Sequence, residues 1–232
     1  MSTFYVIATP IGNLEDITFR AIRILKEVDI VLCEDTRITK RIFEKYEIST
    51  PMISYHVRSS ETKVDIILGK IKEGKNIALV SDAGTPGISD PGSVLISRIR
   101  EDFKESLVNG EIKIIAIPGP SALTSALSIS GVPTHEFVFL GFMPHKKGRE
   151  TIFKEIRDSQ RTMVFYESPH RILKTLESLK IHLASSDKKI AIARELTKIY
   201  EEMIYGKADE ILEKIKSNVE KQRGEFVIMV YN

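Results

Sequence analysis

The stretch that decides the fold is Ser81-Asp82-Ala83-Gly84-Thr85-Pro86-Gly87-Ile88-Ser89-Asp90-Pro91-Gly92, which directly follows the apolar run of residues 77–80. A short apolar run bounded by turn residues predicts a buried strand, and the helical spacing of apolar residues over 94–103 predicts a helix after the loop. Open α/β sheets bind ligands outside the carboxyl ends of their strands. The stretch therefore predicts an α/β sheet and a ligand-binding loop together.

The same alternation continues on both sides of this loop. Alternating strands and helices of this size predict a largely parallel sheet covered on both faces. The further strands are expected at residues 4–8, 30–33 and 112–117, and the further helices at 17–28, 38–46 and 61–72.

A second series of elements begins after Pro118-Gly119-Pro120, with a helix over 121–129 that stops at Ser130-Gly131-Val132-Pro133. Its neighbouring strands at 190–193 and 202–205 have no helix between them, which predicts a mixed sheet. We expect an N-terminal α/β domain over 1–117 and a C-terminal α/β domain over 118–232, bridged by residues 118–131. The remaining strands are expected at 137–140, 162–166 and 226–230, and the helices at 150–157, 171–183 and 208–216.

Composition excludes several protein classes. The 232 residues are 42% hydrophobic and 28% charged, which is typical of a folded globular protein, and the net charge of +2 means that any RNA contact must come from local basic patches. Cys33 is the single cysteine, so an intramolecular disulfide is impossible, and we expect it to be a small buried residue. The five histidines show no metal-ligand spacing, so no metal is expected. With no leader pattern and no membrane-length apolar segment, the sequence predicts a cytoplasmic protein.

The loop at 81–92 suits a positively charged ligand. Its three glycines let the backbone approach a ligand, but it matches neither a Walker loop nor a dinucleotide-binding turn. Asp82 and Asp90 would repel phosphates and would attract a cation such as S-adenosylmethionine, which carries a sulfonium, an ammonium and no phosphate. The alternative is a tight structural turn with solvated aspartates.

Four other polar loops also follow expected strands or begin expected helices. Each alone is typical of a helix cap or a turn, but together they predict a cleft between the two domains. They are Thr9-Pro10-Ile11-Gly12-Asn13, Pro118-Gly119-Pro120-Ser121-Ala122, Tyr166-Glu167-Ser168-Pro169-His170-Arg171 and Ala193-Arg194-Glu195-Leu196-Thr197-Lys198.

Together with Glu34-Asp35-Thr36-Arg37 and Gly224-Glu225-Phe226-Val227, these loops resemble the tetrapyrrole-methylase superfamily and, within it, the small-subunit ribosomal RNA cytidine 2′-O-methyltransferases. The resemblance covers essentially the whole chain. It implies a homodimer that binds S-adenosylmethionine in the interdomain cleft and methylates a cytidine in the decoding region of 16S ribosomal RNA. The implied cofactor contacts are Pro10, Asp82, Ala83, Gly84, Gly87, Ser121, Ala122, Glu167 and Leu196.

Methyl transfer from a sulfonium mainly requires alignment, but a base or a cation beside the weakly nucleophilic ribose hydroxyl would assist it. We expect Glu34 to be that base and Arg37 to be a cation that holds the RNA; the alternative for Glu34-Asp35 is a helix cap. The basic turn His145-Lys146-Lys147-Gly148-Arg149 suits phosphates, although a solvated loop is the default for such a run. The candidate RNA-binding residues are Arg37, Lys40, Arg41, Lys146, Lys147, Arg149, His170 and Arg171.

Two rival functions remain open from the sequence. A methylase of the same fold could act on a tetrapyrrole or a similar small molecule instead of RNA. A non-catalytic RNA-binding module on the ribosome would need no cofactor loop.

Overall fold

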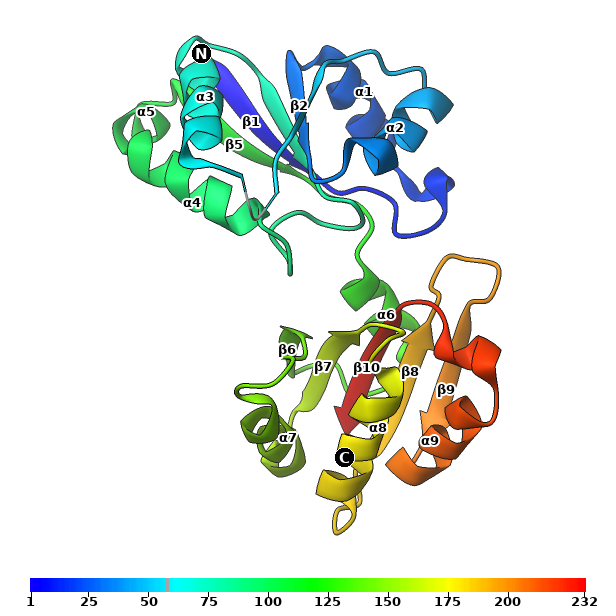
Figure 1. Ribbon diagram of the computed structural model, residues 1–232. Helices are drawn as coiled ribbons and strands as arrows, with labels where there is room; N and C mark the ends of the chain where they lie inside the picture. The colour runs from blue at the N-terminus through cyan, green and yellow to red at the C-terminus, as the bar shows by residue number, and fades with distance from the viewer. Residues whose placement is uncertain (57–58) are drawn as a thin grey trace. The chain divides into compact units, whose positions relative to one another are not determined.

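The computed structural model describes residues 1–56 and 59–232. The chain divides into two compact units, Met1–Ser121 and Ala122–Asn232, which are described separately below (Figure 1). The boundary expected from the sequence lay after residue 117, whereas the structure keeps the following residues with the first unit. There the Thr85 hydroxyl donates to the Pro120 carbonyl at 3.2 Å, and the Gly119 backbone lies so close to Ala8 that an added Cβ would be 3.1 Å from the Ala8 Cβ.

The first unit contains a five-stranded sheet in the order β3-β2-β4-β1-β5, and all its strand pairs are parallel. The parallel sheet predicted from the sequence is confirmed. The short strand β3 was not expected, because three half-buried residues produce no readable periodicity. The strands are β1 (Ser2–Ile7), β2 (Ile30–Cys33), β3 (Met52–Ser54), β4 (Ile77–Val80) and β5 (Ile112–Ile117).

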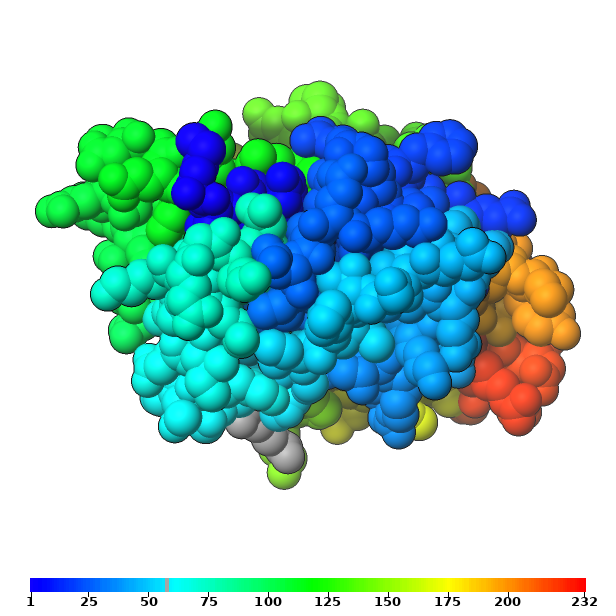
Figure 2. Space-filling model, turned by 90° about the horizontal axis from the view of Figure 1, so that it is seen from above, coloured from blue at the N-terminus to red at the C-terminus, as the bar shows by residue number. Residues whose placement is uncertain are grey.

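Helices cover both faces of this sheet because the strands bury alternate residues in two separate cores. In β2, Val31 and Cys33 pack with α1 and α2, whereas Ile30 and Leu32 pack with α3 and α4. In the space-filling view, the part of the chain coloured from blue to cyan, which includes α1, α2 and α3, lies at the surface of the unit (Figure 2). The helices are η1 (Leu14–Asp16), α1 (Phe19–Glu27), α2 (Thr36–Lys45), α3 (Glu61–Lys72), α4 (Gly92–Asp102) and α5 (Lys104–Val108).

The second unit contains a mixed sheet in the order β6-β7-β10-β8-β9, as predicted. Strands β6 and β7 are parallel, and the other three pairs are antiparallel. The strands are β6 (Phe137–Phe142), β7 (Thr162–Glu167), β8 (Lys189–Arg194), β9 (Glu202–Gly206) and β10 (Phe226–Tyr231).

The two faces of the second sheet are covered by different helices. One face packs against α7, α8 and α9 in a core that includes Phe153, Leu176 and Ile211. The other face holds α6, whose Leu123 N–H donates to the Tyr166 hydroxyl at 3.1 Å. None of the helices within the described residues is both long and apolar enough to cross a membrane. The helices are α6 (Ala122–Ser130), α7 (Arg149–Asp158), α8 (Ile172–Leu183), α9 (Ala208–Lys216) and η2 (Val219–Gln222).

Candidate functional site

The loops that follow β1 and β4 are joined directly at the carboxyl edge of the first sheet. Thr9 and Gly84 exchange two backbone hydrogen bonds of 2.9 Å each, and the Thr9 hydroxyl donates to the Ser81 carbonyl at 3.0 Å. Since β1 and β4 are neighbouring parallel strands, their loops leave the sheet at the same edge. The amide and carbonyl of Gly84 are therefore used in holding this edge together.

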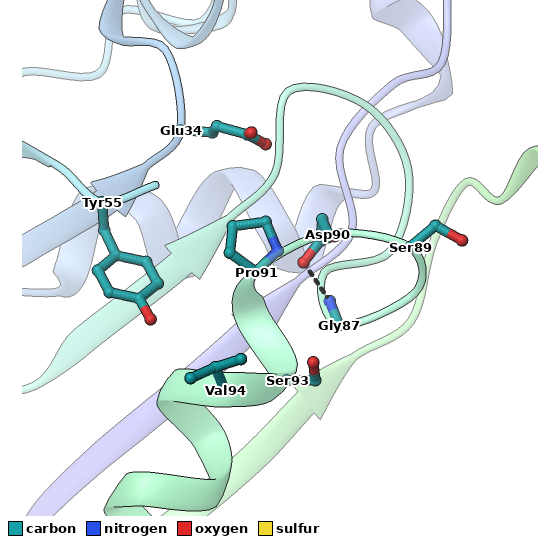
Figure 3. Close-up of a pocket in the computed structure, with 8 residues that line it drawn as sticks. All are labelled: Glu34, Tyr55, Gly87, Ser89, Asp90, Pro91, Ser93 and Val94. Atoms are coloured by element: carbon teal, nitrogen blue, oxygen red, sulfur yellow. Dashed lines mark hydrogen bonds between the residues drawn. The ribbon is translucent and has the colours of Figure 1, made fainter. Parts of the chain in front are cut away.

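The carboxylate of Asp90 closes the loop at 81–92 on itself. Its Oδ1 accepts the backbone N–H groups of Gly87 at 2.8 Å and of Gly92 at 2.7 Å, where α4 begins (Figure 3). A side chain at residue 92 would clash, because an added Cβ would lie 2.9 Å from Asp90 Oδ1. Asp90 therefore has a structural role in the loop, in addition to the negative charge expected from the sequence to attract a cation.

Asp82 links this loop to the one after β2. The backbone N–H of Asp35 donates to Asp82 Oδ1 at 2.9 Å. Burial raises the pKa of Asp82, and the Asp35 N–H opposes that change because it favours the ionised carboxylate. A half-buried carboxylate is therefore fixed at the edge of the sheet, and the next residue, Ala83, is exposed.

Asp35 is the N-cap of α2, as in the alternative interpretation of the Glu34-Asp35 pair. Its Oδ1 accepts the Arg37 N–H at 2.8 Å, and its carboxylate also pairs with the Arg37 guanidinium. The Arg37 side-chain and backbone hydrogen bonds lower the pKa of Asp35 to about 2. Arg37 remains 88% exposed at the side chain, so its guanidinium lies at the surface although it is paired.

Glu34 lines a cavity of about 480 Å³ beside the 81–92 loop (Figure 3). Glu34 directly follows β2, and Tyr55 directly follows β3. Ser93 and Val94 belong to the first turn of α4. Burial raises the pKa of Glu34, and the negative charges of Asp82 and Asp90 raise it further, whereas His56 lowers it. The cavity therefore contains a carboxylate that holds a proton more strongly than an ordinary glutamate.

The sequence reasoning missed Tyr55 and the start of α4 as walls of this cavity. Tyr55 follows β3, the strand that was too short to recognise, so no pattern marked it. Of the residues expected to bind the cofactor in this unit, Gly87 lines the cavity. Ala83 is exposed, Asp82 and Ser121 are partly exposed, and Pro10 and Gly84 are buried.

In the second unit, Glu167 is fully buried at the end of β7. Its carboxylate lies 2.7 Å from Arg171 Nη2, accepts the Thr175 hydroxyl at 2.5 Å, and accepts the Ser168 N–H at 2.8 Å. A cofactor contact from Glu167 would therefore have to come from its backbone, because its carboxylate is already paired.

Arg149 and Arg171 are held in the same buried network. Arg149 is 7% exposed, lies over the Phe153 ring, and donates to the Thr175 hydroxyl at 2.7 Å. Arg171 Nη1 donates to the Met143 carbonyl at 2.6 Å, and its side chain is 17% exposed. The expectation that Arg149 and Arg171 bind RNA is therefore corrected, because both guanidinium groups bind partners inside the unit.

The remaining basic candidates are exposed. Lys40 and Arg41 lie on the outer side of α2, Lys146 and Lys147 precede α7, and His170 precedes α8.

Leu196 lies in a loop whose backbone is strained. Its two neighbours, Glu195 and Thr197, have positive φ values of 52° and 66°, which are costly for residues with a side chain. Lys198 and the backbone N–H of Glu225 both donate to Glu195 Oε1, at 2.8 and 3.0 Å. These bonds hold the loop in shape, and nothing in the local sequence signals the strain.

Cys33 is buried, as expected, and burial raises the pKa of its thiol. Across the described residues, no three His, Cys, Asp or Glu side chains are grouped so that they could hold a metal ion.

The comparisons with known proteins agree on one family. The model of the tetrapyrrole (corrin/porphyrin) methylases matches residues 3–212. A relative from Thermotoga maritima, named ribosomal RNA small subunit methyltransferase I, is 42% identical over 99% of this chain and 98% of its own length. A relative of the same name from Bacillus subtilis is 43% identical over 99% of this chain and 75% of its own length.

The fold agrees with a solved methyltransferase. The crystal structure of the methyltransferase CobJ matches with a TM-score of 0.69 and 20% identity, over all of this chain and 95% of that chain. The family model and the two relatives confirm the family resemblance inferred from the sequence. The chain belongs to the tetrapyrrole methylase family and, within that family, to the ribosomal RNA small subunit methyltransferase I enzymes.

Proposed function

We propose that this protein transfers the methyl group of S-adenosylmethionine to the ribose 2′-hydroxyl of a cytidine in the decoding region of 16S ribosomal RNA. The name of the two relatives supports ribosomal RNA of the small subunit as the substrate. The proposed chemistry rests on one observation: Glu34, a carboxylate of raised pKa, lines a cavity beside the glycine-rich loop.

The loop at 81–92 suits S-adenosylmethionine better than a phosphate-bearing cofactor. It contains no Lys, Arg or His, and Asp82 places a half-buried negative charge at its start. A carboxylate there would attract the positive charges of the cofactor and repel phosphate groups. The cofactor contacts we propose are Pro10, Asp82, Ala83, Gly87 and Ser121 in the first unit, with Gly84 as support, and Ala122, Leu196 and the Glu167 backbone in the second.

S-adenosylmethionine supplies a methyl carbon that is already activated by the positive sulfur. The protein's task is to orient the ribose oxygen and to receive its proton. Glu34 is the proposed general base, because its raised pKa brings it closer to the operating pH and therefore makes it a stronger base than an exposed glutamate. Such assistance contributes roughly 10²- to 10⁴-fold to a rate.

Exposed cations are proposed to hold the RNA backbone. Arg37, Lys40 and Arg41 lie on α2, whose N-cap Asp35 directly follows Glu34, so the base and these charges belong to one continuous segment. Lys146, Lys147 and His170 form the corresponding set on the second unit. We further propose that the protein works as a homodimer in the cytoplasm, as the family resemblance implies.

The test is methyl transfer from labelled S-adenosylmethionine to small ribosomal subunits from cells that lack this chain, followed by mapping of 2′-O-methyl groups. Labelling at one cytidine of the decoding region is expected. Transfer to a corrinoid but not to the subunits would favour the small-molecule methylase instead. Saturable RNA binding with no binding of S-adenosylmethionine would favour a non-catalytic module.

A further inference from the structure

A bulge in β6 turns one large aromatic side chain out of the core of the second unit. Val138 and Leu140 pack against the core beneath α7 and α8, and strict alternation would bring Phe142 to the same face. Instead the register with β7 shifts after Phe139, so that Phe142 pairs with Tyr166. Gly141, with a φ of 66°, lies in the bulge. Because one inserted residue exchanges the two faces of a strand, Phe142 lies on the face of Tyr166 and is 53% exposed.

The exposed Phe142 ring packs against the Tyr166 ring. Phe142 and Phe139 both meet the Tyr166 ring edge-on, with centroid distances of 5.4 and 4.9 Å. Tyr166 is itself fixed, because its hydroxyl accepts the Leu123 N–H of α6. The three rings, here called the Phe142 platform, therefore present a preorganised apolar surface to solvent.

The Phe142 platform adjoins the basic turn. Lys146 follows Phe142 by four residues, so the two Cα atoms are at most about 14 Å apart. Residues 143–148 include two exposed lysines and no carboxylate. The buried network fixes the backbone that links Phe142 to the basic turn. Arg171 donates to the Met143 carbonyl, and Arg149 Nη1 donates to the Pro144 carbonyl at 3.2 Å.

We infer that Phe142 stacks on an unpaired base of the RNA substrate while Lys146 and Lys147 contact neighbouring phosphates. This inference rests on the proposed function and adds a base-binding subsite to it. Single-stranded RNA is recognised by aromatic rings that stack on splayed bases, combined with positive charge along the backbone. A symmetric contact with a second copy fits the surface less well, because the same patch on both copies would bring the lysine pairs together.

The experiment compares Phe142→Leu with Phe137→Leu in the full chain. Phe137 begins the same strand and is 39% exposed, but it lies about 16 Å away along the strand and is not part of the platform. Binding to small ribosomal subunits that lack the modification is measured across a salt series, with calorimetry of S-adenosylmethionine binding as a folding control. Phe142→Leu is expected to weaken subunit binding roughly 5- to 150-fold, which corresponds to the loss of one stacked base. Its salt slope and cofactor affinity stay those of the parent, and Phe142→Tyr restores binding.

Three other results would overturn the inference. If the parent methylates the subunits and Phe142→Leu binds them equally well, the stacking subsite is wrong and the proposed function stands. If the parent neither binds nor methylates the subunits, both proposals fail. If Phe142→Leu sediments as a monomer where the parent sediments as a dimer, while its RNA affinity is unchanged, the platform is a contact between copies of the chain.

Discussion

The backbone N–H of Asp35 donates to the carboxylate of Asp82 at 2.9 Å, which joins the loops after β2 and β4. Asp35 also caps α2, so Asp82 fixes the segment that carries Glu34, the proposed base, and Arg37. One carboxylate thus belongs to the proposed cofactor loop and also positions the proposed catalytic segment.

The two roles of Asp82 can be separated by two substitutions. Asp82→Asn keeps an oxygen that can accept the Asp35 N–H but removes the charge, whereas Asp82→Ala removes both. If the charge attracts the cofactor, both variants lose at least about fivefold in S-adenosylmethionine affinity, corresponding to about 1 kcal/mol for a charge pair at 4 Å in water. Calorimetry measures this loss, and Asp82→Asn binding as tightly as the parent would show that Asp82 acts only through Asp35.

Gly84→Ala is expected to weaken cofactor binding as well as stability. Both Gly84 and Gly110 have positive φ values, 81° and 74°, so alanine at either position costs about 1–2 kcal/mol of backbone strain. Gly84 alone exchanges hydrogen bonds with Thr9 at the sheet edge, and nothing lies within 4 Å of a Cβ at Gly110. Urea unfolding should show similar losses for both variants. Equal cofactor affinity in the two variants would exclude a role for the Thr9 and Gly84 bridge.

Glu34→Gln is expected to stabilise the protein near neutral pH while it slows methylation. Burial, with the charges of Asp82 and Asp90, raises the pKa of Glu34 above its ordinary value of 4.5. The folded protein therefore resists ionisation, and the stability that the protonated group provides below pH 4.5 is lost as the pH rises through the raised pKa. Glutamine never ionises, so the variant should gain melting temperature over the parent at pH 8 but not at pH 4.

The activity of the same variant tests the role of the base. Methyl transfer by the parent should increase with pH through the raised pKa, and Glu34→Gln should be slower by roughly 10²- to 10⁴-fold with no such increase. A variant that methylates at the parental rate would leave Glu34 as a structural residue of the cavity.

Glu167→Gln is expected to destabilise the protein by about 3–5 kcal/mol, because it leaves the buried charges of Arg149 and Arg171 without their counterion. The control is Glu150→Gln, which removes a carboxylate that is 75% exposed and should change stability by less than about 0.5 kcal/mol. Denaturant unfolding of the two variants measures both values. If both variants lose the same small free energy of unfolding, the buried network does not stabilise the protein as expected.

Reversing the charges of Lys146 and Lys147 to glutamate should abolish RNA methylation and leave S-adenosylmethionine affinity unchanged. Removing one lysine–phosphate interaction lowers the logarithmic salt slope of RNA binding by roughly 0.7–0.9. The same double reversal at Lys214 and Lys216, exposed lysines of α9, is the matched control. If the slope and methylation of the first variant equal those of the second, Arg37, Lys40 and Arg41 remain as the RNA-binding candidates.

The sequence by itself determined the parallel sheet, the mixed sheet and the loops that follow their strands. Runs such as residues 30–33 and 77–80 are apolar throughout because they are buried on both faces, and that property is visible without knowing any neighbour. The glycines and prolines of the 81–92 loop are equally local signals, since they reflect backbone angles at single positions.

Only the tertiary structure decided what the charged and aromatic side chains do. A guanidinium looks the same in a sequence whether it faces solvent, as Arg37 does, or is buried, as Arg149 is. The difference arises because Arg149 meets Thr175 and Glu167, whose positions depend on how α7, α8 and β7 pack together. Phe142 faces solvent because of a register shift against β7, which is a property of two strands and not of one. Hydrophobic periodicity is a short-range pattern. The partner of a charged side chain and the register between two strands depend instead on residues brought together from distant parts of the chain.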